Sequence, residues 1–347
     1  MRFDAISRDL EASASVEQCV ELVDKLQRRL RNAVVEALTA ARSKTVRERK
    51  VCPHCGCSSV HRHGRDARGR QRFKCVGADG CGRSFGVLQG TAFHRMRKPE
   101  AWLAYAERLL EGASLTQIVE DEIGISRHTA WRWRHRLLPA MVITPQPVLS
   151  GIVEVDETFF LKSFKGHRGW KRGNPPAKRP PRYRGSGALQ RGLSHEQVPV
   201  LTAVDRGRKH FDKVLDRRDN AIILKSLKPF IERGSMICSD GFQAYQELAS
   251  RTGSDHRVIE FKLPTPEAKA EGLPRGRPGA LGLGRINSWH EVLDTRINRI
   301  HRGVSTRYLS NYLSLIQNDR AERLRPKAAL ERVMTPPVKR PLRRPHT

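Results

Sequence analysis

The sequence predicts a multidomain α/β protein with a small zinc ribbon, a helix-turn-helix region and a larger core of strands and helices. Three observations predict this order. Five of the seven cysteines lie within 30 residues, a basic helical segment follows them, and short apolar runs alternate with amphipathic segments from residue 150 onward. A chain of 347 residues is long enough for about two or three domains.

The charge is strongly positive, with 65 Lys+Arg against 36 Asp+Glu and a formal net charge of +29. Such an excess favours a polyanionic partner, and nucleic acid is the first candidate. A ribosomal-type or merely basic protein is the alternative. No apolar run reaches the ~18 residues of a membrane span, and the N-terminus lacks the apolar segment of a signal peptide. We therefore expect a cytoplasmic protein with no membrane partner.

Residues 1–50 form the first region, and apolar residues recur there at helical spacing from Val16 to Leu38. The opposite face carries Glu, Arg and Lys. This pattern predicts a helix that docks on a surface or pairs with another helix.

Residues 51–86 are expected to form a zinc ribbon. The cysteine spacing is Cys52-x2-Cys55 followed by Cys75-x5-Cys81, and two such pairs make a tetrahedral site for structural Zn²⁺. Residues 64–70 suit a hairpin turn between the pairs. The second pair is wider than the usual x2 spacing, and His54 and Cys57 remain competing ligands.

Residues 98–142 are expected to hold several short helices. Gly124 and Ser126 form a turn and a cap before a basic helix over residues 127–138, an arrangement that resembles the recognition helix of a helix-turn-helix. A helical spacer is the alternative. The candidate DNA contacts on this helix are Arg127, His128, Arg132 and Arg136.

The third region, residues 150–322, carries acids beside apolar runs. Asp156 ends the run Ile152–Val155, and Asp240 ends the run Met236–Ser239. Carboxylates at strand ends can meet across a sheet and hold a divalent cation such as Mg²⁺ or Mn²⁺, and two such ions promote phosphodiester transfer. For either acid alone, capping of the next turn is the alternative.

A third ligand is expected from a helix around residues 287–300. Trp289, Leu293, Ile297 and Ile300 form its core stripe, so His290 lies at the border of the core and Glu291 faces solvent. This geometry favours His290 over Glu291, with Asn287 intermediate. Because Mg²⁺ prefers oxygen ligands, His290 could instead orient a phosphate or water, or be a partly buried structural histidine.

Two further stretches are basic. Residues 158–195 carry ten Lys/Arg and no acid, which predicts a flexible DNA-contacting insertion that includes Lys171 and Arg172. The Pro-rich tail at residues 323–347 is expected to be disordered.

Three motifs resemble those of the DDE-type insertion-sequence transposases of the ISXO2-like group: GIVEVDETFF, CSDGFQAY and INSWHEVLDTRINRIHRGVSTRYLSNYLSLI. The resemblance implies an N-terminal zinc ribbon, a helix-turn-helix and an RNase H-like mixed-sheet core. It makes Asp156 and Asp240 the first two catalytic acids and puts His290 where DDE enzymes usually have Glu. It also implies double-stranded DNA as partner, both transposon ends and target, with a homo-oligomer acting in the bacterial nucleoid.

Two other functions remain open from the residues. A zinc-ribbon and helix-turn-helix regulator, or a domesticated and inactive transposase, would bind DNA without chemistry. An RNase H-like nuclease would cleave without strand transfer.

Overall fold

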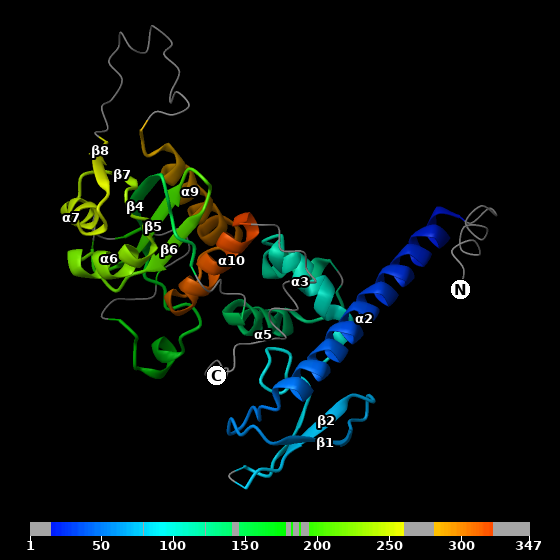
Figure 1. The fold of residues 1–347 in the computed structure, drawn as a ribbon. Helices are drawn as coiled ribbons and strands as arrows, with labels where there is room; N and C mark the ends of the chain where they lie inside the picture. Colours follow the sequence, from blue (N-terminus) through cyan, green and yellow to red (C-terminus); the bar gives the residue numbers. More distant parts are fainter. Residues whose placement is uncertain are drawn as a thin grey trace. The chain divides into compact units, whose positions relative to one another are not determined.

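The computed structural model describes residues 15–78, 80–121, 123–140, 146–177, 182, 187–188, 194–259 and 281–321. The chain divides into two compact units, Met1–Met141 with Leu324–Thr347, and Val142–Arg323 (Figure 1). The predicted tail at 323–347, much of the second half of the basic insertion and residues 1–14 of the N-terminal region lie outside the described residues. Within the described ranges, no helix is both long and apolar enough to cross a membrane.

The first unit begins with the long helix α2 (Val16–Arg49). A capping box starts it, in which the Ser15 side chain accepts from the Gln18 amide and the Gln18 side chain accepts from the Ser15 amide. Its residues up to position 34 are exposed or intermediate, whereas Val35, Leu38 and Val46 are buried. The buried apolar residues of α2 therefore all lie in its C-terminal half, and Arg31 pairs with Glu107 of α3 at 3.1 Å.

A small antiparallel sheet follows, in the order β1 (Val60–Arg65), β2 (Gln71–Cys75), β3 (Ser84–Gly86). Its core is one small cluster in which Val46 of α2 joins Val60, Phe73, Phe85 and two of the cysteines. A core of this size cannot hold a domain together alone, so the cysteines are expected to contribute through a metal.

Three helices complete the described part of this unit: α3 (Trp102–Leu110), α4 (Leu115–Glu120) and α5 (Arg127–Leu137). Ser114 caps α4 and Ser126 caps α5. The Tyr105 hydroxyl of α3 donates to the Ala130 carbonyl of α5 at 2.6 Å, and its ring packs edge-to-face on Trp133. These contacts orient α5 against α3.

The second unit is built on a mixed five-stranded sheet in the order β6-β5-β4-β7-β8. Strand β4 pairs antiparallel with β5 and parallel with β7; β5 and β6 are antiparallel, and β7 and β8 are parallel. The strands are β4 (Ile152–Leu161), β5 (Gln197–Asp205), β6 (His210–Val214), β7 (Met236–Ser239) and β8 (Asp255–Val258).

Helices cover both faces of this sheet (Figure 1). On one face, α6 (Asn220–Leu227) and α7 (Gln243–Thr252) pack against Val153, Val155 and Ile237. On the other, α9 (Gly284–Asp294) and α10 (Leu309–Ala321) pack against Phe160, Val198 and Val200.

Several predicted elements have different limits. Strand β4 continues to Leu161, so Asp156 lies within a strand rather than at its end, and the basic insertion loses its first four residues to that strand. The helix expected over 287–300 begins at Gly284 and becomes a π-helix over Thr295–Ile300. Strands β6 and β8 are not predicted from the sequence, because these two edge strands carry many polar residues and show only a weak apolar pattern.

Candidate active site and metal centre

Strand β4 carries three acids in the sequence Glu154-Val155-Asp156-Glu157, and the pleat sends them to different faces. Successive side chains alternate across a strand, so Glu154 and Asp156 share the face covered by α9, whereas Glu157 shares the face of Val153 and Val155. The three carboxylates therefore have different surroundings.

Asp156 lies in β4, and Asp240 directly follows the end of β7, the parallel neighbour of β4. The β4–β7 register pairs Glu154 with Cys238, and two residues further along each chain are Asp156 and Asp240. Burial, together with the Asp240 and Glu157 carboxylates, raises the pKa of Asp156 to about 6. A carboxylate in such an acidic surrounding suits a bound cation.

His290 of α9 completes this group. The Thr202 hydroxyl donates to the Asp156 carbonyl at 3.0 Å, so it can only accept from His290 Nε2, 2.5 Å away. Burial lowers the pKa of His290 to about 4, which keeps the ring neutral. Nδ1 therefore presents a lone pair, 3.9 Å from Asp156 Oδ2. A lone pair and a carboxylate oxygen at this separation fit ligation of one divalent ion.

The two alternative third ligands are placed differently. Glu291 is exposed, as the helical period predicts, and Asn287 is exposed as well. His290 is the residue of the three that the structure brings to 3.9 Å from an Asp156 carboxylate oxygen.

An arginine missed by the sequence reasoning lies beside these acids. Arg218 Nη2 is 3.2 Å from an oxygen of buried Glu157 and 3.7 Å from Asp240 Oδ2, and its guanidinium stacks 3.8 Å above the Phe242 ring. Arg218 could not be singled out from the sequence, because the chain contains many arginines. Its position next to Asp240 depends on the contact between β4 and the segment before α6.

Glu154 anchors the helix that carries His290. Its buried carboxylate accepts from the backbone amides of Arg285 at 2.8 Å and Ile286 at 3.0 Å, and it pairs with Arg206 at 3.0 Å. An anion at a helix N-terminus satisfies amides that have no partner within the helix. Glu154 thereby fixes α9 to the strand that carries Asp156.

We expect Glu154→Gln to lower the free energy of unfolding of this unit by about 2–3 kcal/mol, because it leaves Arg206 without its buried partner. Urea unfolding measures this loss. The matched control is Glu247→Gln, which removes an exposed pair with Arg251 on the surface of α7 and should cost less than ~0.5 kcal/mol. Equal stability of the two variants would contradict the anchoring role.

The cysteine cluster has the geometry of a tetrahedral metal site. The Sγ atoms of Cys52 and Cys81 are 3.7 Å apart, those of Cys55 and Cys75 are 3.8 Å apart, and all four lie within 4.8 Å of one another. Zn–S bonds of about 2.3 Å at tetrahedral angles require S···S distances of about 3.8 Å. The four predicted cysteines therefore fit a zinc ion.

Cys57 and His54 are not part of this group. Cys57 Sγ accepts from the Ser59 amide, and the His54 ring packs edge-to-face on Phe85. The wide Cys75–Cys81 spacing is accommodated by a turn at Gly80, where a Cβ atom would lie 2.7 Å from Cys75 Sγ.

The side chains predicted to contact DNA differ in how exposed they are. Arg127, His128 and Arg132 are exposed on α5, whereas Arg136 is partly buried and donates to the His94 carbonyl. Lys171 and Arg172 are exposed in a short 3₁₀ turn, Gly169–Arg172. Arg136 is therefore the least available of these side chains.

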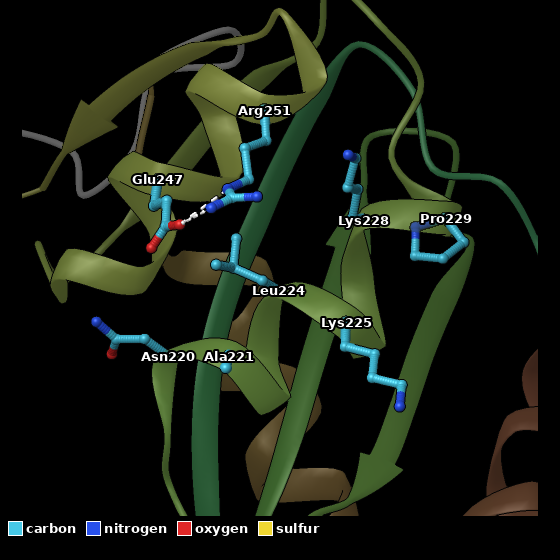
Figure 2. Close-up of a pocket in the computed structure, with 8 residues that line it drawn as sticks. All are labelled: Asn220, Ala221, Leu224, Lys225, Lys228, Pro229, Glu247 and Arg251. Atoms are coloured by element: carbon cyan, nitrogen blue, oxygen red, sulfur yellow. Dashed lines mark hydrogen bonds and ion pairs between the residues drawn. The ribbon is translucent and has the colours of Figure 1, made fainter.

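A surface pocket of about 530 Å³ lies between α6 and α7 (Figure 2). None of the predicted site residues lines it. Its basic side chains are Lys225, Lys228 and Arg251, and Arg251 is already paired with Glu247. The candidate chemistry is therefore elsewhere, where β4, β7 and α9 meet.

Comparison with known proteins gives one family. Residues 148–317 match the family model described as ISXO2-like transposase domain. No curated protein matches the chain significantly. A cryo-EM structure of the simian T-cell lymphotropic virus intasome in complex with PP2A regulatory subunit B56 gamma aligns with 63% of this chain and 69% of that chain at 11% identity. Its TM-score of 0.28 is too low to establish a common fold.

Proposed function

Because the chain carries an ISXO2-like transposase domain over residues 148–317, we propose that it is the DNA transposase of a bacterial insertion sequence. It binds the ends of its element, cleaves a DNA strand there and transfers that strand to target DNA. This makes it a DDE-type polynucleotidyl transferase.

The observation that carries the proposal is the meeting of Asp156, Asp240 and His290. Asp156 comes from β4, Asp240 follows the end of the parallel strand β7, and His290 comes from the helix that Glu154 anchors to β4. A protein that only binds DNA has no need for a buried carboxylate beside a second acid and a neutral imidazole.

We propose that these three side chains hold Mg²⁺ or Mn²⁺. Bound divalent ions activate an attacking oxygen and stabilise the leaving oxygen in phosphodiester transfer. The protein side chains do the positioning: Thr202 fixes the ring of His290 through Nε2, and Arg218 holds Asp240 against Glu157. The same carboxylates would serve both cleavage and strand transfer.

The strand order supports an RNase H-like core. Three antiparallel strands are followed by two parallel ones in the order β6-β5-β4-β7-β8, with helices on both faces. In this arrangement β4, the first strand of the unit, lies at the centre of the sheet. Asp156 of β4 lies beside Asp240, which follows the parallel strand β7.

The first unit is proposed as the DNA-binding part. Helices α3–α5 would act as a helix-turn-helix with Arg127, His128 and Arg132 of α5 toward DNA, and the cysteine cluster would hold a structural Zn²⁺. Lys171 and Arg172 would contact phosphates, which makes affinity strongly dependent on salt. Two element ends require more than one chain, so we propose a homo-oligomer on DNA.

The test is a strand-transfer assay with purified protein, Mn²⁺ or Mg²⁺, and a linear duplex carrying the DNA that flanks the reading frame in its native locus. Wild-type protein is expected to release a strand at the element end and join it to a second DNA. For His290→Ala we expect a loss of activity of about 10–100-fold or more, as for other changes in metal environments. Glu291→Ala, at the exposed neighbour, should keep activity within about twofold.

The other outcomes distinguish the alternatives. Cleavage without joining would identify a nuclease, and end binding without cleavage would identify a regulator or an inactive transposase. An active His290→Ala together with an inactive Glu291→Ala would show that the third ligand has been assigned to the wrong residue.

A further inference from the structure

Helix α5 exposes a tryptophan that the proposed function has not used. Trp131 is 38% exposed, whereas Trp133, the other tryptophan of the helix, is 5% exposed and belongs to the core of its unit. A single exposed apolar residue is common on protein surfaces, so the surroundings of Trp131 decide whether it has a role.

The exposed part of α5 is confined to its N-terminal half. The exposed side chains of the helix and its cap are Ser126, Arg127, His128, Trp131 and Arg132. From Trp133 to Leu137 every side chain is buried except that of the partly buried Arg136. At about 100° per residue, Trp131 falls between Arg127 and His128 around the helix axis, near the middle of the exposed sector.

This distribution is that of a helix that presents its first turns to the major groove. In a helix-turn-helix, the recognition helix contacts base edges through its N-terminal residues. In α5 the other half is fixed within the unit, where buried Arg134 donates to the Ala113 carbonyl at 2.6 Å. Trp131 therefore occupies a position from which a recognition helix contacts bases.

Two histidine rings of the same helix hold the Trp131 side chain in place. The His128 ring lies nearly parallel to it, with ring centroids 6.5 Å apart and an interplanar angle of 23°. The buried His135 ring meets it edge-to-face, with centroids 4.7 Å apart. A side chain that is already positioned in this way loses little conformational freedom when it contacts a ligand.

The chemistry of this exposed face fits DNA, and that of Trp131 fits one base. Arg127, His128 and Arg132 can donate to phosphate oxygens, and the sequence of α5 contains no acid. In the major groove, the apolar group that a base edge presents is the C5-methyl group of thymine. An indole ring on a helix in that groove therefore has thymine as its matching base.

We propose that Trp131 is a specificity-determining residue of end recognition, and that its ring packs against the methyl group of a thymine in the transposon end. This role rests on the proposed function, because it requires that α5 bind the element end. Arg127 and Arg132, on the same exposed face, contact phosphates and supply affinity for any sequence, whereas Trp131 supplies the preference for one.

The experiment measures binding of the full-length, zinc-loaded protein to a duplex carrying the DNA that flanks the reading frame, and to a duplex of the same composition with scrambled sequence. Trp131→Ala is expected to weaken binding to the flanking duplex by about tenfold or more. Its binding to the scrambled duplex should stay within about twofold of wild type, and the dependence of its affinity on salt should not change.

Three further variants serve as controls. Arg132→Ala should show the opposite behaviour, with both duplexes bound more weakly by the same factor and the salt slope reduced by about one. Trp131→Phe keeps an aromatic ring and should retain most of the preference. Val20→Ala truncates an exposed apolar residue of α2, 57% exposed, and should bind both duplexes like wild type.

Uracil substitution identifies the base that Trp131 contacts. Uracil differs from thymine only in lacking the C5-methyl group, and each thymine of the flanking duplex is replaced in turn. For wild-type protein, at least one replacement is expected to weaken binding by about fourfold, the effect of losing one buried methyl group. The same replacement should change the affinity of Trp131→Ala by less than about twofold, because the ring that the methyl group contacts has been removed.

Two results would overturn this role of Trp131 and leave the transposase assignment intact. One is a Trp131→Ala variant that prefers the flanking duplex as strongly as wild type does. The other is a set of uracil substitutions that leave wild-type binding unchanged, or that weaken wild type and Trp131→Ala equally. A wild-type protein with no preference for the flanking duplex would overturn the proposed end binding as well. Circular dichroism of Trp131→Ala checks that its helix content is retained.

Discussion

Asp156→Ala and Asp240→Ala are each expected to reduce strand cleavage and strand transfer by at least about a thousandfold, since each removes a proposed ligand of the ions that supply several kcal/mol of transition-state stabilisation. Binding of the element end, which we propose to rest on the first unit, should stay within about twofold. The strand-transfer assay and a gel-shift titration measure the two quantities on the same preparations.

Loss of activity through unfolding can be separated from loss of a ligand. The pKa of Asp156 is raised to about 6, chiefly by burial, so the ionised side chain costs the fold free energy above that pH. Asp156→Asn removes that cost and should unfold at neutral pH at no lower a urea concentration than wild type. Asp216→Ala, at an exposed acid between β6 and α6, is the control and should transfer strands normally. Appreciable activity in Asp156→Ala or Asp240→Ala would refute this active site.

Cys52→Ser is expected to abolish zinc binding and unfold the β1–β3 module. The apolar cluster of this module is small and includes Cys52 itself, so the metal would supply most of its folding free energy, on the order of 10 kcal/mol for structural zinc sites. Metal analysis should find about one zinc per chain in wild type and none in the variant, with protease cleavage appearing within residues 51–86. Binding of the element end by the Cys52→Ser variant should also be weaker than in wild type.

Cys57→Ser provides the matched control, because Cys57 lies in the same loop but outside the group of four. It should keep its zinc and its protease resistance. If Cys57→Ser lost the metal and Cys81→Ser kept it, Cys57 would replace Cys81 in the proposed set of four zinc ligands. The second unit has its own cores and should unfold in urea like wild type in all three variants.

The grouping of the four cysteines and the solvent-facing side of α9 could be predicted because both follow from spacing along the sequence. Metal-ligand spacing reflects the short reach of a turn, and the 3.6-residue period separates His290 from Glu291 without knowledge of what either contacts. The structure groups the four predicted cysteines and leaves Glu291 exposed. The catalytic roles of Asp156, Asp240 and His290 stay predictions that the assays above test.

The sequence could not predict that Glu154, Asp156 and Glu157 contact three different partners. Strand β4 was expected to end at Asp156, yet it continues to Leu161 because both of its neighbours bond it: β5 along its length and β7 at its start. The pleat then sends Glu154 to the start of α9, Asp156 to His290 and Glu157 to Arg218. Periodicity is a property of neighbouring residues, whereas these three contacts join positions about 60 to 130 residues apart and depend on strand register and helix docking, which are set only when the sheet assembles.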